Sequence, residues 1–174
     1  GIDLHWGAAV FEGPTRVRVG SELLSATDVV IATGTGPGLP PIPGLADARP
    51  QTNRTIFTMP RQPDRLAVIG GGPIGLELGQ SFLRLGSSVT LFEAAPSIAG
   101  TEDPEVSMEL TKILEREDMR IVAGAQIQRV DREEDGSVVV VTDGGRFEFD
   151  EVLVAAGRLP QVPEGLPELG LELD

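Results

Sequence analysis

The sequence contains no cysteine and a single histidine, His5. The missing thiols exclude a disulfide scaffold, a cysteine nucleophile, a thiolate zinc site and an iron–sulfur cluster within these 174 residues. A lone histidine argues against a histidine-based metal site and against a Ser-His-Asp triad. We therefore expect no metal site, and we interpret His5 as a structural strand residue.

Positive charge is also scarce. Lysine and arginine together number 14, against 27 aspartates and glutamates, which gives a formal net charge of −13. An acidic chain repels phosphate backbones, so nucleic acid is not an expected partner. Hydrophobic residues make up 40% of the sequence and charged residues 24%, which is typical of a globular domain and unlike a disordered chain.

Long apolar stretches are absent too. The longest apolar runs include residues 66–69 and 152–156, far short of the ~20 residues of a membrane-spanning helix. The first residues lack the basic segment and apolar stretch of a signal peptide. We therefore expect no membrane association and a cytoplasmic location.

Glycine and proline, by contrast, are abundant, with 22 and 14 copies. Many of them fall in residues 34–50, where prolines fix φ and remove amide donors, so we interpret this segment as a semi-rigid connector. Four short segments ahead of it have the composition of β-strands separated by turns. These segments are residues 4–11, 15–19, 23–26 and 28–32.

The most informative glycines are Gly70, Gly72 and Gly75, which form a G-x-G-x-x-G motif. The motif follows an apolar predicted strand, residues 66–69, and opens a predicted helix with Pro73 in its first turn. In dinucleotide-binding folds the first glycine permits a tight turn, the second lets the backbone approach a pyrophosphate, and the third lets helix and strand pack closely. The helix N-terminus offers amide groups and partial positive charge to the anion. The sequence therefore predicts a pyrophosphate-binding loop here.

A carboxylate stands at the end of the next predicted strand, residues 88–93. It belongs to Glu93, 18 residues after Gly75. A carboxylate at this place accepts hydrogen bonds from a ribose 2′-hydroxyl and repels a 2′-phosphate. No arginine follows it, since the next residues are Ala94, Ala95 and Pro96. This pattern favours NAD(H) over NADP(H).

The remaining segments complete a predicted α/β unit. Asp103 and Pro104 have the pattern of a helix N-cap and first turn, ahead of an amphipathic stripe. After this helix come a buried strand, an antiparallel meander and an apolar strand: residues 119–122, then 126–132, 137–142 and 146–150, then 151–155. The predicted fold class is α/β, a Rossmann-like parallel sheet with helices on both faces and a three-stranded antiparallel β-meander.

An internal repeat links residues 7–34 with residues 124–157. Each stretch is a short meander that leads into an apolar strand and a turn of small residues. A complete strand–glycine loop–helix unit precedes the second copy, and none precedes the first. We therefore expect the chain to be a fragment that lacks an upstream nucleotide-binding unit. The alternative is chance similarity between two β-meanders.

Taken in order, five features resemble the pyridine nucleotide-disulfide oxidoreductases, which are flavoproteins that bind two dinucleotides, and among these the dihydrolipoyl dehydrogenase and mercuric reductase-like members. The features are the turn at residues 32–34, the proline-rich connector, the loop at residues 70–77, Glu93, and the turn at residues 155–160. The resemblance implies that residues 1–44 are the trailing part of an FAD-binding domain with its connector, which adds extra strands. Residues 45–158 would then be the NAD(H)-binding domain and residues 159–174 the start of the return to the FAD-binding domain.

The resemblance also implies roles for individual residues. Glu93 would bind the adenosine ribose, Ile127 would lie near the adenine and Gly157 near the nicotinamide. Glu77 would be a catalytic acid facing flavin and nicotinamide, paired with a lysine outside this chain; the alternative is an ordinary helix glutamate. The remaining positions fall into two groups: Gly70, Gly71, Gly72, Pro73, Ile74, Gly75 and Glu77 around the NAD pyrophosphate, and Ala9, Thr33, Gly34 and Thr35 at FAD.

The implied function is to present NADH for hydride transfer to flavin, with electrons passing on to a disulfide or another acceptor. The cofactors would be NAD(H) and, in the full-length protein, FAD. The full-length protein would form a homodimer through a domain outside this chain, and the fragment alone would be inactive. Two alternatives remain: an NADH oxidase or ferredoxin-reductase-like flavoprotein without a redox disulfide, and a stand-alone NAD-binding module.

Overall fold

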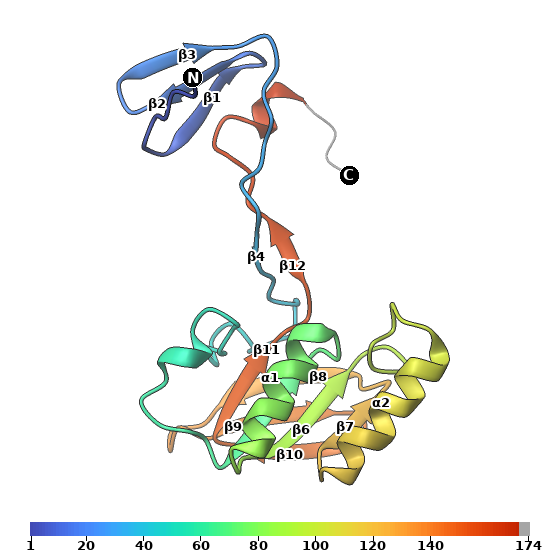
Figure 1. The fold of residues 1–174 in the computed structure, drawn as a ribbon. Helices are drawn as coiled ribbons and strands as arrows, with labels where there is room; N and C mark the ends of the chain where they lie inside the picture. Colours follow the sequence, from blue (N-terminus) through green and yellow to red (C-terminus); the bar gives the residue numbers. More distant parts are fainter. Residues whose placement is uncertain (171–174) are drawn as a thin grey trace. The chain divides into compact units, whose positions relative to one another are not determined.

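The computed structural model describes residues 1–170 (Figure 1). The chain separates into two compact units. One unit contains residues 1–36 and the chain from residue 159 onward, and the other contains residues 37–158. In the two stretches that join the units, β4 (Thr35–Pro37) pairs with β12 (Arg158–Pro160).

The first unit is built on an antiparallel sheet of three strands in the order β1-β2-β3. The strands are β1 (Ala9–Gly13), β2 (Arg16–Val19) and β3 (Glu22–Ser25). The returning chain binds to β1, because the Phe11 amide donates to the Glu164 carbonyl at 2.8 Å. Phe11 and Leu166 are buried, and the short 3₁₀ helix η2 (Pro167–Leu169) follows.

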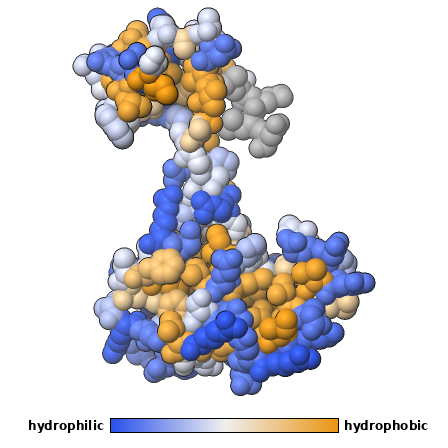
Figure 2. Space-filling view, in the orientation of Figure 1, coloured by the Kyte–Doolittle hydropathy of each residue, from blue (hydrophilic) through white to orange (hydrophobic). Residues whose placement is uncertain are grey.

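The strand predicted at residues 28–32 is absent from the structure. These apolar residues pair with no other strand in residues 1–170, and Val30 is 88% exposed. An apolar strand forms only where a neighbour supplies a hydrogen-bonding ladder, and the described chain supplies none here. Apolar surface is visible on the face of this unit that Figure 2 shows, and Trp6 is 90% exposed.

The second unit contains a parallel sheet of four strands in the order β11-β5-β6-β7. The strands are β5 (Arg65–Ile69), β6 (Ser88–Glu93), β7 (Arg120–Ala123) and β11 (Glu151–Val154), and the short helix η1 (Ile56–Thr58) precedes β5. The three strands β11, β5 and β6 are almost entirely buried, as their continuous apolar runs predict.

The two helices, α1 (Pro73–Arg84) and α2 (Pro104–Arg116), cover one face of this sheet (Figure 1). The meander of β8 (Ile127–Arg132), β9 (Val138–Thr142) and β10 (Gly145–Phe149) covers the other face. Phe92 of β6 contacts Phe147 and Phe149 of the meander edge-to-face, with ring centroids 5.4 and 6.0 Å apart.

The predicted α/β class with a parallel sheet and meander is confirmed, but the expected placement of helices on both faces is wrong. The reason is the strand order. The crossovers β5–α1–β6 and β6–α2–β7 move across the sheet in the same direction, so right-handed connections place both helices on one face. The connection from β7 back to β11 runs the opposite way and covers the second face with the meander.

The helix starts differ in detail from expectation. Pro104 begins α2, but the side chain of Asp103 makes no capping hydrogen bond with the described residues. Pro73 begins α1 after Gly72, as predicted. Neither helix, nor any other within residues 1–170, is long and apolar enough to cross a membrane.

Two glycines allow α1 to begin directly against the end of β5. Gly70 has a φ of +113°, and a Cβ on it would lie 2.5 Å from the Ala155 carbonyl oxygen. A Cβ on Gly75 would lie 2.0 Å from the Gly70 carbonyl oxygen. Backbone atoms meet backbone atoms at both places. A side chain on Gly75 would push the helix away from the end of β5, and one on Gly70 would push the turn after β11 away from the loop.

We expect Gly75→Ala to destabilise the fold by roughly 1–3 kcal/mol, because an added methyl group has no space beside a fixed carbonyl. The measurement is the free energy of unfolding in urea. Gly79→Ala on the same helix is the matched control, since its Cβ would meet its nearest neighbour, Met119, at 3.4 Å. The control should be neutral or stabilising by about 0.5–1 kcal/mol. Equal stability of the two variants would contradict the packing argument.

Candidate functional site

A cavity of about 680 Å³ lies at the carboxyl ends of β5, β6 and β11. Four segments at the sheet edge form most of it. They are the glycine loop after β5, the end of β6, the start of β8, and the turn after β11. Ligands of open parallel sheets bind outside the carboxyl ends of the strands, so the cavity has the position of a cofactor site.

The glycine loop presents the N-terminus of α1 to this cavity. The first intrahelical acceptor is the Gly72 carbonyl, to which the Leu76 amide donates at 3.0 Å. The amides of Ile74 and Gly75 precede that bond, and an α-helix offers such amides no internal acceptor. Together with the helix dipole they form a site for an anion.

Gly72 differs from the other two glycines of the motif. A Cβ on Gly72 would meet no protein atom within 4 Å, and its φ of −80° suits any residue. Protein packing therefore requires glycine at Gly70 and Gly75 but not at Gly72. The open space in front of Gly72 fits a ligand that approaches the backbone closely, as a pyrophosphate does.

Glu93 is the last residue of β6 and lies at the rim of the cavity. Its carboxylate accepts hydrogen bonds from the amides of Gly71 at 2.6 Å and Ala95 at 2.7 Å. Among the described residues that line the cavity, Arg158 is the one basic residue, and Ala94 is the neighbour beside Glu93. The cavity thus places the Glu93 carboxylate beside the amides at the N-terminus of α1, which are suited to bind an anion.

The structure brings most of the predicted NAD-binding residues together. Gly71 and Gly75 are buried and do not line the cavity, and Glu77 is exposed on α1 outside the cavity lining. The four positions predicted to contact FAD belong to the first unit, where the Thr33 hydroxyl donates to the Gln161 carbonyl. The residues gathered at the cavity are Gly70, Gly72, Pro73, Ile74, Glu93, Ile127 and Gly157.

Several residues that line the cavity were not predicted from the sequence. Pro40 and Ile42 come from the segment interpreted only as a connector, and Gln126 directly precedes the predicted Ile127. Gln126 could have been found from its place at the start of the meander. The connector residues carry no such signal, because only the folded chain brings them beside the loop.

Comparisons with known proteins agree with this geometry. Residues 1–174 match the family described as pyridine nucleotide-disulphide oxidoreductase. The chain belongs to this family. It is 40% identical over 162 residues to a mercuric reductase of Lysinibacillus sphaericus, covering 91% of this chain and 30% of the relative. It is 36% identical over 181 residues to a dihydrolipoyl dehydrogenase of Thermus scotoductus, covering 99% of this chain and 39% of the relative.

Among solved structures, the chain is similar to the HOCl-induced flavoprotein disulfide reductase RclA from Escherichia coli. The TM-score is 0.85 at 28% sequence identity, covering 97% of this chain and 39% of that one. The chain therefore spans roughly a third of the length of these family members. The resemblance predicted from the motifs is confirmed.

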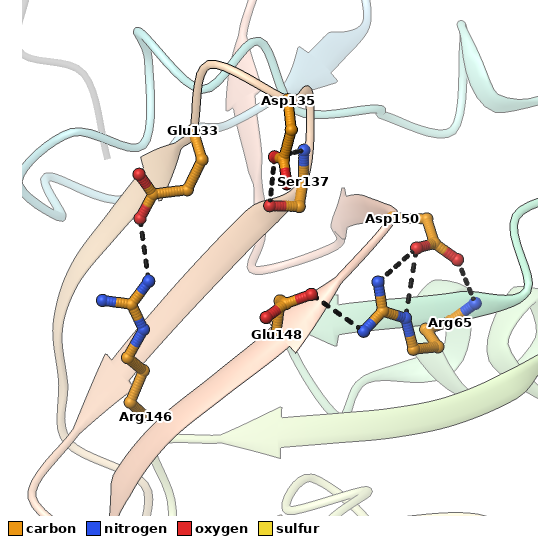
Figure 3. A network of polar contacts seen from close by, with 7 residues as sticks. All are labelled: Arg65, Glu133, Asp135, Ser137, Arg146, Glu148 and Asp150. Atoms are coloured by element: carbon orange, nitrogen blue, oxygen red, sulfur yellow. Dashed lines mark hydrogen bonds and ion pairs between the residues drawn. The ribbon is translucent and has the colours of Figure 1, made fainter.

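The second unit of the chain also has a second cavity, of about 820 Å³, which is larger and lined mainly by polar residues. It lies where β5 begins, and three of its charged residues, Arg65, Glu148 and Asp150, are paired with one another (Figure 3). The Arg65 side chain binds Asp150 at 2.6 Å and Glu148 at 3.1 Å. No group of metal-ligating side chains occurs within residues 1–170. We therefore take the smaller cavity as the candidate functional site.

This network shifts the titration of its carboxylates. Burial raises the pKa of Asp150, but hydrogen bonds from the side chain and backbone of Arg65 outweigh it and leave the pKa below the ordinary value. The pKa of Asp135 is lowered by hydrogen bonds from the hydroxyl and amide of Ser137 (Figure 3). Because both folded-state values are lowered, the stabilisation is present above the unfolded-state pKa and is lost as the pH falls through the folded-state value.

We expect Asp150→Asn to be less stable than the wild type at pH 7, and the difference to shrink as the pH falls below about 4. Thermal unfolding from pH 7 to pH 3 measures it. Asp143→Asn is the control, because the exposed Asp143 side chain makes no ion pair within the described chain. A stability difference between Asp150→Asn and the wild type that stays the same from pH 7 to pH 3 would contradict the lowered pKa of Asp150.

Proposed function

We propose that this chain is the NAD(H)-binding portion of an FAD-dependent pyridine nucleotide-disulfide oxidoreductase, and that it presents NADH for hydride transfer to the flavin. One observation carries the proposal. The cavity combines an open helix N-terminus at Gly72 with the carboxylate of Glu93. This is the pair of groups that a dinucleotide needs, one for the pyrophosphate and one for the ribose.

The chain's own residues bind and orient the cofactor in this proposal. The amides of Gly72 and Ile74 hold the pyrophosphate, and Glu93 accepts hydrogen bonds from the ribose hydroxyls. Ile127 contacts the adenine, and Gly157 leaves room for the nicotinamide because it has no side chain. When bound, NADH supplies the hydride, and the protein contributes its alignment.

The preference for NAD(H) over NADP(H) follows from charge. A 2′-phosphate would approach the Glu93 carboxylate, and like charges repel across a partly buried site. The residues after Glu93 are alanines, which offer a phosphate no positive charge. The Glu93 carboxylate and the lack of a basic residue directly after it therefore both favour NAD(H).

The flavin-side assignments belong to the same proposal. Ala9, Thr33, Gly34 and Thr35 contact FAD in the full-length protein, and Glu77 faces flavin and nicotinamide. The exposure of the Glu77 side chain supports this role, because it leaves the carboxylate available to a partner. The match to the pyridine nucleotide-disulphide oxidoreductase family and the similarity to a flavoprotein disulfide reductase support a parent enzyme with a redox disulfide over a stand-alone module.

Titration of the chain with NADH and NADPH by calorimetry tests the cofactor assignment. We expect NADH to bind about tenfold more tightly or better, since the 2′-phosphate removes a charge-assisted hydrogen bond and adds repulsion. Equal or tighter binding of NADPH would contradict the role of Glu93. Absence of NADH binding would contradict the proposed function itself.

Gly72→Ala separates the binding role of the loop from its structural role. We expect the free energy of unfolding to change by less than about 1 kcal/mol, because the new Cβ meets no protein atom. NADH affinity should fall by about tenfold or more, because the methyl group occupies the approach of the pyrophosphate. Gly79→Ala, on the same helix and outside the cavity lining, should keep NADH affinity. Unchanged NADH affinity in Gly72→Ala would place the pyrophosphate elsewhere.

A further inference from the structure

The carboxylate of Glu93 is bound by the protein without any cofactor. One oxygen accepts from the Gly71 amide at 2.6 Å, and the other accepts from the Ala95 amide at 2.7 Å. Both bonds are short, as hydrogen bonds to a charged acceptor are. The first of them joins the end of β6 to the glycine loop, across 22 residues of sequence.

The peptide groups on both sides of Gly71 are held. The Gly71 carbonyl accepts from the Ala99 amide at 2.8 Å. A Cβ on Gly71 would lie 3.0 Å from both Glu93 Oε2 and Ile98 Cγ2, so the loop packs closely against these residues. Ile98 is itself fixed, because its side chain is fully buried and its carbonyl accepts from the Ser107 hydroxyl at 2.7 Å.

These contacts join the glycine loop to the segment that follows β6. Residues 93–99 bind Gly71 through its amide and its carbonyl, and Ser107 connects that segment to α2. Gly71 lies one residue before Gly72, where the proposed pyrophosphate site opens. The orientation of the anion-binding amides therefore depends on the side chain that is proposed to recognise the ribose.

We propose that Glu93 is a positioning residue for the pyrophosphate loop as well as a ribose ligand, an inference that rests on the proposed function. A carboxylate has about four acceptor sites, and the two backbone amides leave room for ribose hydroxyls. Pyrophosphate binding and ribose recognition are thus coupled through one side chain. Replacing Glu93 therefore lowers the affinity for both NADH and NADPH, and does not convert a preference for NADH into one for NADPH.

The decisive variant is Glu93→Gln, which keeps the shape of the side chain. One accepting oxygen becomes an NH₂ donor that faces a backbone N–H, so one loop contact is lost. If Glu93 acted only on the ribose, the amide oxygen would still accept from a hydroxyl, and loss of the charge would raise NADPH affinity. The positioning role predicts that NADH and NADPH affinities both fall, by about tenfold.

A third ligand separates the two roles further. An NADH analogue whose adenosine ribose lacks both the 2′- and 3′-hydroxyls has no ribose contact with Glu93. The positioning role predicts that Glu93→Gln also weakens this analogue by about tenfold. Hydrogen exchange of the Gly71 and Ala95 amides in the ligand-free chain should be faster in Glu93→Gln. Glu105→Gln, on the exposed first turn of α2, is the control and should change neither affinity nor exchange.

Glu93→Asp is the second variant, and it carries the test if Glu93→Gln does not fold. It keeps the charge but is one methylene shorter, so it cannot reach both amides, and it should weaken the analogue as well. Unchanged affinity for the analogue in the folded variants would overturn the positioning role while leaving the proposed function intact. Failure of the wild-type chain to bind NADH would overturn the proposed function first.

Discussion

The close approach of backbone to backbone between the end of β5 and the start of α1 is the constraint on which the site depends. Gly75 stands against the Gly70 carbonyl, and Gly70 against the Ala155 carbonyl that follows β11. This contact places the helix N-terminus at the sheet edge instead of a turn away from it. The same contact places the turn after β11 opposite the loop, which closes the cavity.

The sheet that carries this contact is buried on both faces by different means. Right-handed crossovers place α1 and α2 on one side, and the return from β7 to β11 places the meander on the other. The meander begins at Ile127 beside the cavity, so the element that completes the core also supplies a wall of the site. The buried core and the lining of the cavity therefore share the same strands.

Local pattern predicted most of the second unit. The strands and helices follow from apolar periodicity, glycine and proline, and the glycine motif with its spacing to the next strand points to Gly70, Gly72 and Glu93, which line the cavity. Strand order does not appear in such patterns, so the covering of the second face could not be predicted. The segment at residues 28–32 has the pattern of a strand but no neighbour in the described chain.

The contacts of Glu93 with Gly71 and Ala95 could not be predicted from the sequence either, since they depend on how two loops meet. A crystal structure of the chain with NADH tests the central claim most directly. The account predicts the pyrophosphate at the amides of Gly72 and Ile74, and the adenosine ribose at Glu93 with its bond to Gly71 retained. A nucleotide bound in the larger polar cavity beside Arg65, or a pyrophosphate away from Gly72, would contradict it.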